Sequence, residues 1–110
     1  MGVKVKKMEY RFTNENFDTE VMNSEVPVLI DFYADWCGPC RMIAPFLEEI
    51  QSEINVDIVK VNIDESPNLA SEYNVMSIPT LAIFKKGEKV SVNVGAASKA
   101  RLIDWIKANQ

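Results

Sequence analysis

The sequence predicts an α/β fold, in which a mixed and largely parallel β-sheet carries helices on both faces. Strand-like and helix-like segments alternate along the chain, which is typical of α/β domains. Two strand-like segments are apolar runs that each hold one internal charge, as expected for strands buried on both faces. The length of 110 residues, with 47% hydrophobic and 25% charged residues, predicts a single globular domain spanning 1–110.

The N-terminal half is expected to hold two strands and two helices. A short strand is predicted at 7–12, followed by a first helix that Thr13 or Asn14 caps. The apolar run at 28–34 is predicted to be a buried strand. From about Pro39 the apolar residues recur at helical spacing, which predicts a long amphipathic helix. Its apolar positions are Ile43, Phe46, Leu47, Ile50 and Ile54.

The C-terminal half is expected to complete the sheet. A second buried strand is predicted at 57–63, and Ser66 is expected to cap a short helix after it. The segments 80–85 and 89–94 are predicted strands joined by a Lys-Gly turn, which makes them an antiparallel hairpin. Ser98 is expected to cap a final helix. The prediction is therefore a five-stranded mixed sheet flanked by four helices.

Composition and charge exclude several functions. The chain has 12 Lys and Arg against 16 Asp and Glu, a net charge of −4, so it lacks the basic surface that nucleic-acid binding requires. It has no histidine, which removes histidine-based catalysis and nearly all zinc enzyme sites. With only two cysteines it cannot be a disulfide-framework protein.

The sequence shows no targeting or membrane segment. No stretch approaches the roughly 18 apolar residues of a membrane helix, and the lysines near the N-terminus are not followed by the apolar part of a secretory signal. We therefore expect a cytoplasmic protein that does not contact a membrane. Thiols are normally kept reduced in that compartment, so the two cysteines need a role other than structural cross-linking.

The two cysteines form a Cys-Gly-Pro-Cys motif at residues 37–40, between a buried strand and a long helix. Residues three apart on a helix are close enough for small torsional changes to close a disulfide. Cys37 is expected at the helix start, where unpaired N–H groups and the helix dipole favour the reactive thiolate. Cys40 lies one turn further in and should be less exposed. Cys37 is therefore predicted to attack a substrate disulfide, and Cys40 to resolve the mixed disulfide.

Three other interpretations of the cysteine pair compete with this one. A zinc site needs four ligands, and the chain offers two thiols and no imidazole. A purely structural disulfide would close a short loop and stabilise the fold by about 2 kcal/mol. Two incidental buried cysteines would leave the Gly-Pro between them unexplained. The coincidence of motif, strand–helix context and helix start favours redox chemistry.

Several stretches of the chain resemble the motifs of the thioredoxin family. They are DFYADWCGPCRMIAP at 31–45, VKVNID at 59–64, SIPTL at 77–81, KKG at 85–87 and VGA at 94–96. These stretches occur in order over roughly residues 8–108. The resemblance implies a thioredoxin fold and a general protein-disulfide reductase. It also implies that the sheet order is first, third, second, fourth and fifth strand.

The resemblance implies roles for two charged residues inside predicted strands. Asp31 is implied to lie beneath Cys40 and to act as general base for its thiol, through water, and burial should raise the pKa of Asp31. The sequence by itself equally allows an Asp31 that faces solvent or binds backbone. Lys60 is implied to approach Asp31 and tune its charge, whereas the sequence by itself favours a side chain that reaches the surface.

The resemblance also implies a surface that binds clients. An X–Pro bond is usually trans, but the matching family proline is cis and faces the dithiol, so a cis Ile78–Pro79 bond is implied. The Ile78 backbone is then expected to pair with an extended substrate. A flat apolar patch around Cys37 is expected to comprise Trp36, Gly38, Pro39, Ile78, Pro79, Gly95 and Ala96.

The residue before the second cysteine distinguishes this chain from relatives. Disulfide isomerases and strong oxidases usually carry His at that position, and glutaredoxins usually carry a Pro-Tyr pair between their cysteines. Pro39 offers no proton-donating side chain to hold the Cys37 thiolate, which favours a reductant. Three departures from the family pattern are mild: Tyr33 stands where Trp is usual, Arg41 replaces a usual Lys and keeps the charge, and Ser77 stands where Gly or Arg is frequent.

The resemblance implies protein partners and no metal or organic cofactor. Thioredoxin reductase is the implied electron donor, and ribonucleotide reductase, peroxiredoxin and methionine sulfoxide reductase are implied acceptors. The protein is expected to be a monomer. Two other functions remain as alternatives: an oxidase or isomerase, which Pro39 disfavours, and a docking subunit in which the dithiol is incidental.

Overall fold

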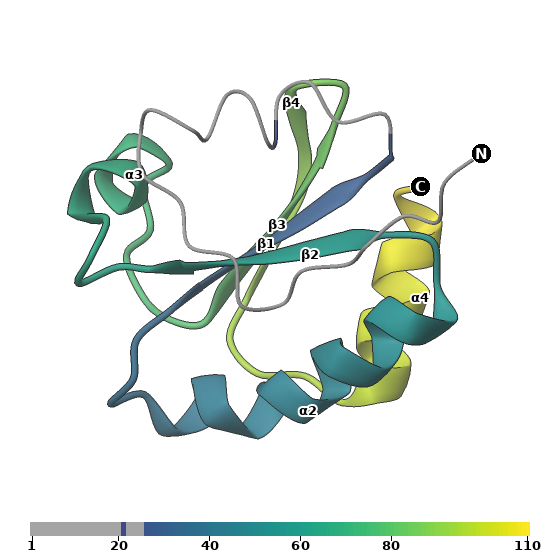
Figure 1. The fold of residues 1–110 in the computed structure, drawn as a ribbon, viewed down its shortest axis with the longest axis horizontal. Helices are drawn as coiled ribbons and strands as arrows, with labels where there is room; N and C mark the ends of the chain where they lie inside the picture. Colours follow the sequence, from purple (N-terminus) through teal and green to yellow (C-terminus); the bar gives the residue numbers. More distant parts are fainter. Residues whose placement is uncertain (1–20, 22–25) are drawn as a thin grey trace.

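The structure, a computed structural model, describes residue 21 and residues 26–110. The strand predicted at 7–12 and the helix predicted after it lie outside the described residues. The remaining predicted elements are confirmed, with ends that shift by one or two residues (Figure 1). They are β1 (Val28–Tyr33), α2 (Gly38–Glu53), β2 (Asp57–Asn62), α3 (Pro67–Glu72), β3 (Thr80–Lys85), β4 (Glu88–Val94) and α4 (Lys99–Ala108).

The four described strands form one mixed sheet in the order β2-β1-β3-β4. The strands β1 and β2 pair in parallel, with Asp31 opposite Lys60. The strands β1 and β3, and then β3 and β4, pair antiparallel, as the predicted hairpin requires. For these four strands the order is the one that the family resemblance implies. All six residues of β1 are buried, which agrees with its apolar sequence and its central position.

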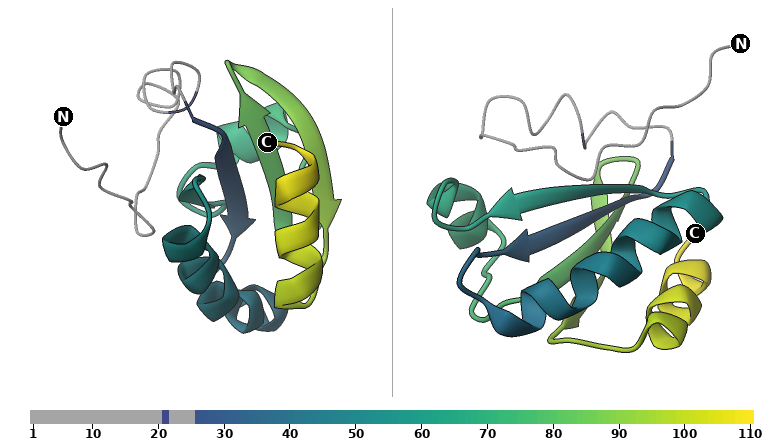
Figure 2. Two further views of the ribbon diagram at one scale, coloured as in Figure 1. Left: turned by 90° about the vertical axis from the view of Figure 1, so that its right-hand side faces the viewer. Right: turned by 60° about the horizontal axis from the view of Figure 1, so that its bottom comes forward.

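Helices cover both faces of the sheet (Figure 2). The helices α2 and α4 lie side by side on one face, where Leu47 and Leu102 pack with Ile83 of β3. The short helix α3 covers the other face, where Leu69 packs with Phe32 and with other residues of the same cluster. The sheet is therefore the middle layer of an α/β/α arrangement, which confirms the predicted fold class.

The long helix α2 begins at the cysteine motif, and both its first residues and the spacing of its buried residues explain why. Pro39 lies in the first turn, where its missing N–H leaves no hydrogen bond unmade. The buried positions Cys40, Ile43 and Leu47 follow at spacings of three and four residues, so the second cysteine belongs to the face that packs on the sheet. The helix continues through Pro45 to Glu53.

The two predicted serine caps have different outcomes. Ser98 Oγ accepts a hydrogen bond from the Arg101 N–H at 3.2 Å, as predicted for the start of α4. Ser66 stands at the N-cap position of α3, but its side chain makes no capping hydrogen bond, so that part of the prediction is wrong. The ψ of Ser66 is 62°, whereas Ser98 has the extended ψ of 159° that directs a cap oxygen toward the first turn.

The packing of α2 on the sheet gives a first testable prediction. Leu47 is fully buried between α2 and the sheet, so Leu47→Ala should lower the free energy of unfolding by about 2–5 kcal/mol. The neighbouring Glu48 is exposed, and Glu48→Ala should change it by less than about 0.5 kcal/mol. Urea unfolding of both variants measures the difference. Equal effects would contradict this placement of the helix.

Candidate active site

The two cysteines form a disulfide at the start of α2. Their Cα atoms are 5.3 Å apart. Cys37 is the N-cap residue of the helix, and its Sγ accepts a hydrogen bond from the Cys40 N–H at 3.1 Å. This N–H is one of the donors that a helix leaves unpaired at its N-terminus, and it would equally stabilise negative charge on a reduced Cys37. The geometry therefore favours the thiolate at Cys37 rather than at Cys40.

The exposure of the two cysteines does not differ as expected. Cys37 is 5% exposed and Cys40 is 4% exposed, because both side chains are drawn together by the disulfide and pack with Tyr33 and Ala34. The distinction between the cysteines therefore comes from their place in the helix. Cys37 lies at its N-cap, whereas Cys40 lies on its buried face.

Trp36, directly before the first cysteine, is held at the surface by a hydrogen bond. The residue is 67% exposed, which agrees with the expected place in a client-binding patch rather than in the core. Its Nε1–H donates to Asp64 Oδ2 at 3.0 Å, and the Asp64 N–H donates to Asn62 Oδ1 at 2.8 Å. Asp64 stands out in the sequence only as the last residue of the VKVNID stretch, with no role of its own. The parallel pairing of β1 and β2 could have indicated it, because the segments after parallel neighbours emerge at the same edge of a sheet.

The loops around Pro79 and Gly95 meet beside the disulfide. The Ile78–Pro79 peptide bond is cis, and Ile78 packs against the cluster that holds both cysteines. The Gly95 N–H donates to the Pro79 carbonyl oxygen at 2.8 Å, which joins the two loops. Gly95 has a φ of 92°, a conformation that glycine adopts without strain.

The predicted patch residues come from the first turn of α2 and from the loops around Trp36, Pro79 and Gly95, with unequal exposure. Pro79 is buried, so it contributes little surface to the apolar patch, and Ile78 and Gly95 are partly exposed. A Cβ added to Gly38 would meet no heavy atom within 4 Å, so the folded chain itself does not require glycine there. The exposed members are Trp36, Gly38, Pro39 and Ala96.

Asp31 is a carboxyl group buried in the middle of the sheet. The residue is 1% exposed, and no described residue forms a hydrogen bond with its Oδ1. Burial raises the pKa of Asp31 from 3.8 to about 7, and the positive charge of Lys60 partly opposes that rise. Asp31 is two residues after Leu29 on β1, so the two side chains lie on the same face of the sheet. Leu29 packs with residues of α2, and Asp31 is therefore on the face toward which Cys40 also points.

Lys60 is positioned by an aromatic ring. Its Nζ lies 4.3 Å from the centre of the Tyr33 ring, a distance typical of a cation–π contact. Tyr33 and Lys60 line a cavity of about 100 Å³ whose wall also includes Cys40. A cavity of this size can hold several water molecules beside the second cysteine. The sequence pattern places Tyr33 on the same strand face as Asp31, but it does not indicate this contact with Lys60, which comes from the neighbouring strand.

The described residues provide thiol chemistry and no metal centre. No group of three or more His, Cys, Asp or Glu among them could hold a metal ion. No helix in the described part of the chain is long and apolar enough to cross a membrane. A cysteine pair that closes a disulfide at a helix N-terminus, directly after a central strand, is the chemistry of thiol–disulfide oxidoreductases.

Comparison with known proteins identifies the family. The Thioredoxin family profile matches residues 9–108. A thioredoxin from Rickettsia felis is 46% identical over 101 residues, which cover 90% of this chain and 96% of that protein. Thioredoxin 1 from Nostoc sp. is 55% identical over 92 residues, covering 82% and 86%, and a thioredoxin from Synechocystis sp. is 53% identical over 97 residues, covering 86% and 91%.

The chain belongs to the thioredoxin family. It is a protein-disulfide oxidoreductase that works by dithiol–disulfide exchange, and its redox-active pair is the Cys37–Cys40 disulfide. Its substrates are disulfide-containing proteins, and thioredoxin reductase is the typical partner of this family.

The buried carboxyl group gives a prediction about stability and pH. The folded pKa of Asp31, about 7, is above the unfolded value of 3.8, so the folded state holds this proton more tightly. The resulting stabilisation is complete below about pH 4 and is lost as pH rises toward 7. Asp31→Asn carries no such charge, so it should gain stability over the wild type across that range, by up to about 4 kcal/mol.

Thermal unfolding of both proteins between pH 4 and pH 8 measures this gain. The variant Asp35→Asn removes an exposed carboxylate just after β1 and controls for the change in net charge. If Asp31→Asn were less stable than the wild type at pH 8, the burial of an ionisable Asp31 would be contradicted.

Proposed function

We propose that the whole chain is one thioredoxin domain that donates electrons to disulfide-containing proteins, with Cys37 as the attacking residue. The observation that carries this assignment is the hydrogen bond from the Cys40 N–H to the Cys37 Sγ at the helix N-cap. It supports Cys37 as the cysteine with the more stable thiolate, and the thiolate is the nucleophile in disulfide exchange.

The reaction consists of two exchanges. The Cys37 thiolate attacks one sulfur of the client disulfide, forming a mixed disulfide and releasing the other client sulfur as a thiolate. Cys40 then loses its proton and attacks the Cys37 Sγ, which releases the second client sulfur and closes the Cys37–Cys40 disulfide. The client gains two electrons, and its two thiolates take up the proton that Cys40 released and one proton from solvent. A reductase later returns two electrons to the Cys37–Cys40 disulfide, and Cys40 takes up one proton again.

Asp31 and Lys60 are proposed to handle the proton of Cys40. A carboxyl group with a pKa of about 7 can both accept and release a proton near neutral pH, which suits a general base. The cavity that Cys40, Tyr33 and Lys60 line can hold water beside the Cys40 thiol. Asp31 does not line this cavity but faces the same side of the sheet, and it is proposed to receive the proton through that water. Lys60 keeps the pKa of Asp31 from rising further, so that part of the carboxyl population is ionised at neutral pH.

The apolar patch is proposed to bind the client. The loop that ends at Ile78 packs against the cysteine cluster, so its backbone is available to an extended segment that presents a disulfide to Cys37. The exposed Trp36, Gly38 and Pro39, which neighbour Cys37 in the sequence, add an apolar surface to the same region. Pairing through backbone reads few side chains and therefore suits several clients.

The reductant role suggests specific protein partners. Ribonucleotide reductase, peroxiredoxin and methionine sulfoxide reductase are proposed acceptors, and thioredoxin reductase is the proposed donor, with the protein acting as a monomer. A cytoplasmic location is proposed because a reductant needs a compartment in which dithiols are kept reduced. Pro39 supports the reductant role over that of an oxidase, because it places no proton donor beside Cys37.

Replacing the two cysteines separately tests the assignment. Cys37→Ser should abolish the reduction of protein disulfides such as those of insulin. Cys40→Ser should keep the nucleophile but lose the resolving step, so it should accumulate a covalent mixed disulfide with the client through Cys37. Mass spectrometry of the trapped species identifies the bonded cysteine. Trapping by Cys37→Ser through Cys40 would reverse the assignment.

The proton pathway predicts a change in pH dependence. Since Lys60 lowers the pKa of Asp31, Lys60→Gln should move the rise in the rate of the resolving step to higher pH. Asp31→Asn should remove that rise and slow the step near neutral pH. Stopped-flow measurement of the second thiol released from an aromatic disulfide follows the step directly. The exposed Lys86→Gln is the control, and a shift of equal size in that variant would contradict a specific role for Lys60.

A further inference from the structure

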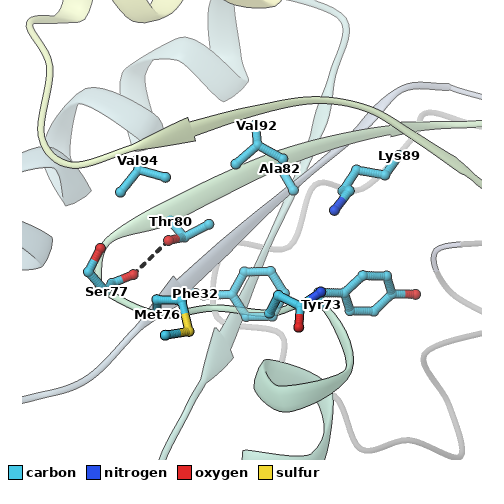
Figure 3. Close-up of a pocket in the computed structure, with 10 residues that line it drawn as sticks. Phe32, Tyr73, Met76, Ser77, Thr80, Ala82, Lys89, Val92 and Val94 are labelled. Atoms are coloured by element: carbon cyan, nitrogen blue, oxygen red, sulfur yellow. Dashed lines mark hydrogen bonds between the residues drawn. The ribbon is translucent and has the colours of Figure 1, made fainter.

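An apolar pocket of about 330 Å³ lies between the segment after α3 and the strands β3 and β4 (Figure 3). Phe32 and Ala82 contribute side chains from the buried sheet face, and Tyr73 closes the end next to Lys89. Figure 3 shows Ser77 and Val94 at the opposite end. The pocket is therefore an elongated hollow along β4 and is separate from the cavity beside Cys40.

Three apolar residues at the rim of the pocket are more exposed to solvent than apolar residues usually are. Met76 is 92% exposed, Val94 is 62% exposed and Val92 is 43% exposed. In the sheet that the structure describes, β4 is an edge strand, paired with β3 alone. Exposed apolar side chains that gather around a hollow at a sheet edge are typical of a surface that binds an extended segment.

The pocket continues the apolar patch around the disulfide. Ser77 directly precedes Ile78, and Val94 directly precedes Gly95, so both ends of the joined loops lead into it. The Thr80 hydroxyl donates to the Ser77 carbonyl oxygen at 2.6 Å and holds this boundary in place. A client segment that pairs with the Ile78 backbone would reach the pocket after one or two further residues, at about 3.3 Å per residue.

The charge at the far end of the pocket selects a complementary ligand. Among the described residues that line it, Lys89 is the one charged residue, and no carboxylate is present. The Lys89 Nζ lies 5.9 Å from the centre of the Tyr73 ring, at the edge of cation–π range. The pocket thus combines an apolar interior with a positive end, which fits an apolar side chain followed by an acidic one.

We propose that this pocket, the β4 pocket, is a second binding site for the client polypeptide. It takes a large apolar side chain, such as leucine, from the extended segment near the client cysteine, and Lys89 attracts an acidic residue next to it. The inference rests on the proposed function, because it needs a client held at the apolar patch. The β4 pocket would make client binding depend on the client's amino-acid sequence, whereas the apolar patch contacts mainly the client's backbone.

A peptide series tests the preference. Disulfide-bearing peptides carry one leucine that is moved, one position at a time, through a background of Ser, Gly and Asn on either side of the cysteine. The wild type should reduce peptides with leucine at one or two alternate positions with a kcat/KM about tenfold higher than that of the leucine-free peptide. The alternation is expected because every second side chain of an extended segment faces the pocket.

Two valines of β4 form a matched pair of variants. Val90 and Val92 are both 43% exposed, but Val92 lines the pocket and Val90 does not. Val92→Asp should remove the tenfold preference and leave the leucine-free peptide unaffected, whereas Val90→Asp should keep the preference. Circular dichroism verifies that both variants fold. If Val90→Asp and Val92→Asp behaved alike, the proposal would be overturned.

Charge reversal tests the pocket in a second way that leaves its apolar side chains unchanged. Lys89→Glu should lose the additional gain that an aspartate beside the leucine provides in the wild type. Lys86→Glu, in the same hairpin but outside the pocket, should retain that gain. An aspartate that gives no gain in the wild type would overturn the role of Lys89.

The remaining outcomes show whether the pocket proposal alone fails or whether the proposed reductase function fails as well. If the wild type reduced all peptides equally, the pocket would be overturned while the reductase function stood. If the wild type reduced none of them, or Cys37→Ser reduced them equally well, the proposed function would fall and the pocket with it. A concentration-dependent dimer in sedimentation that Val92→Asp abolished would also overturn the proposal, because a second copy would then cover the pocket.

Discussion

The burial of β1 on both faces is the constraint on which the rest of the site depends. Helices cover both faces of this strand, and all six of its residues are buried. The chain leaves the sheet at the end of β1, and residues 34–37 connect it to the start of α2. The turn places Cys37 at the N-cap of a long helix that packing on the same strand holds in position. The same burial surrounds Asp31 with low-dielectric material and raises its pKa to about 7. One layer of packing therefore positions both the sulfur proposed to attack and the carboxyl group proposed to accept the proton.

The burial that raises the pKa of Asp31 also lowers the stability of the fold once the carboxyl group is ionised. An ionised Asp31 in the core opposes folding above neutral pH, and Lys60 offsets only part of that cost. Lys60 in turn is held by the Tyr33 ring from the strand that carries Asp31. The pairing register of β1 and β2 thus sets the distance between the two charges. A change in that register would move the pKa of Asp31 without altering either cysteine.

Local patterns predicted the elements well because their causes are local. The spacing of Ile43, Leu47 and Ile50 is sufficient to indicate α2, and a run of apolar residues is sufficient to indicate β1. The Trp36–Asp64 hydrogen bond joins residues 28 apart and depends on which strands are neighbours, so no local pattern contains it. The cis bond before Pro79 and the strand order came from the family resemblance alone. The predicted capping hydrogen bond of Ser66 is absent because the backbone angles at that residue, and not only the residue type, decide where its side-chain oxygen points.

The hairpin of β3 and β4 links the reactive sulfur to the outer edge of the sheet. The strand β3 pairs with β1 on one side and with β4 on the other, so the loop before β3 and the loop after β4 both end beside the cysteines. The hydrogen bond from Gly95 to Pro79 closes this pair of loops into one surface. The strand β4, with its exposed valines, extends that surface away from the disulfide. The β4 pocket and the cavity beside Cys40 share a scaffold but no lining side chain, so the recognition proposed for β4 can vary while the dithiol and the buried carboxyl group remain unchanged.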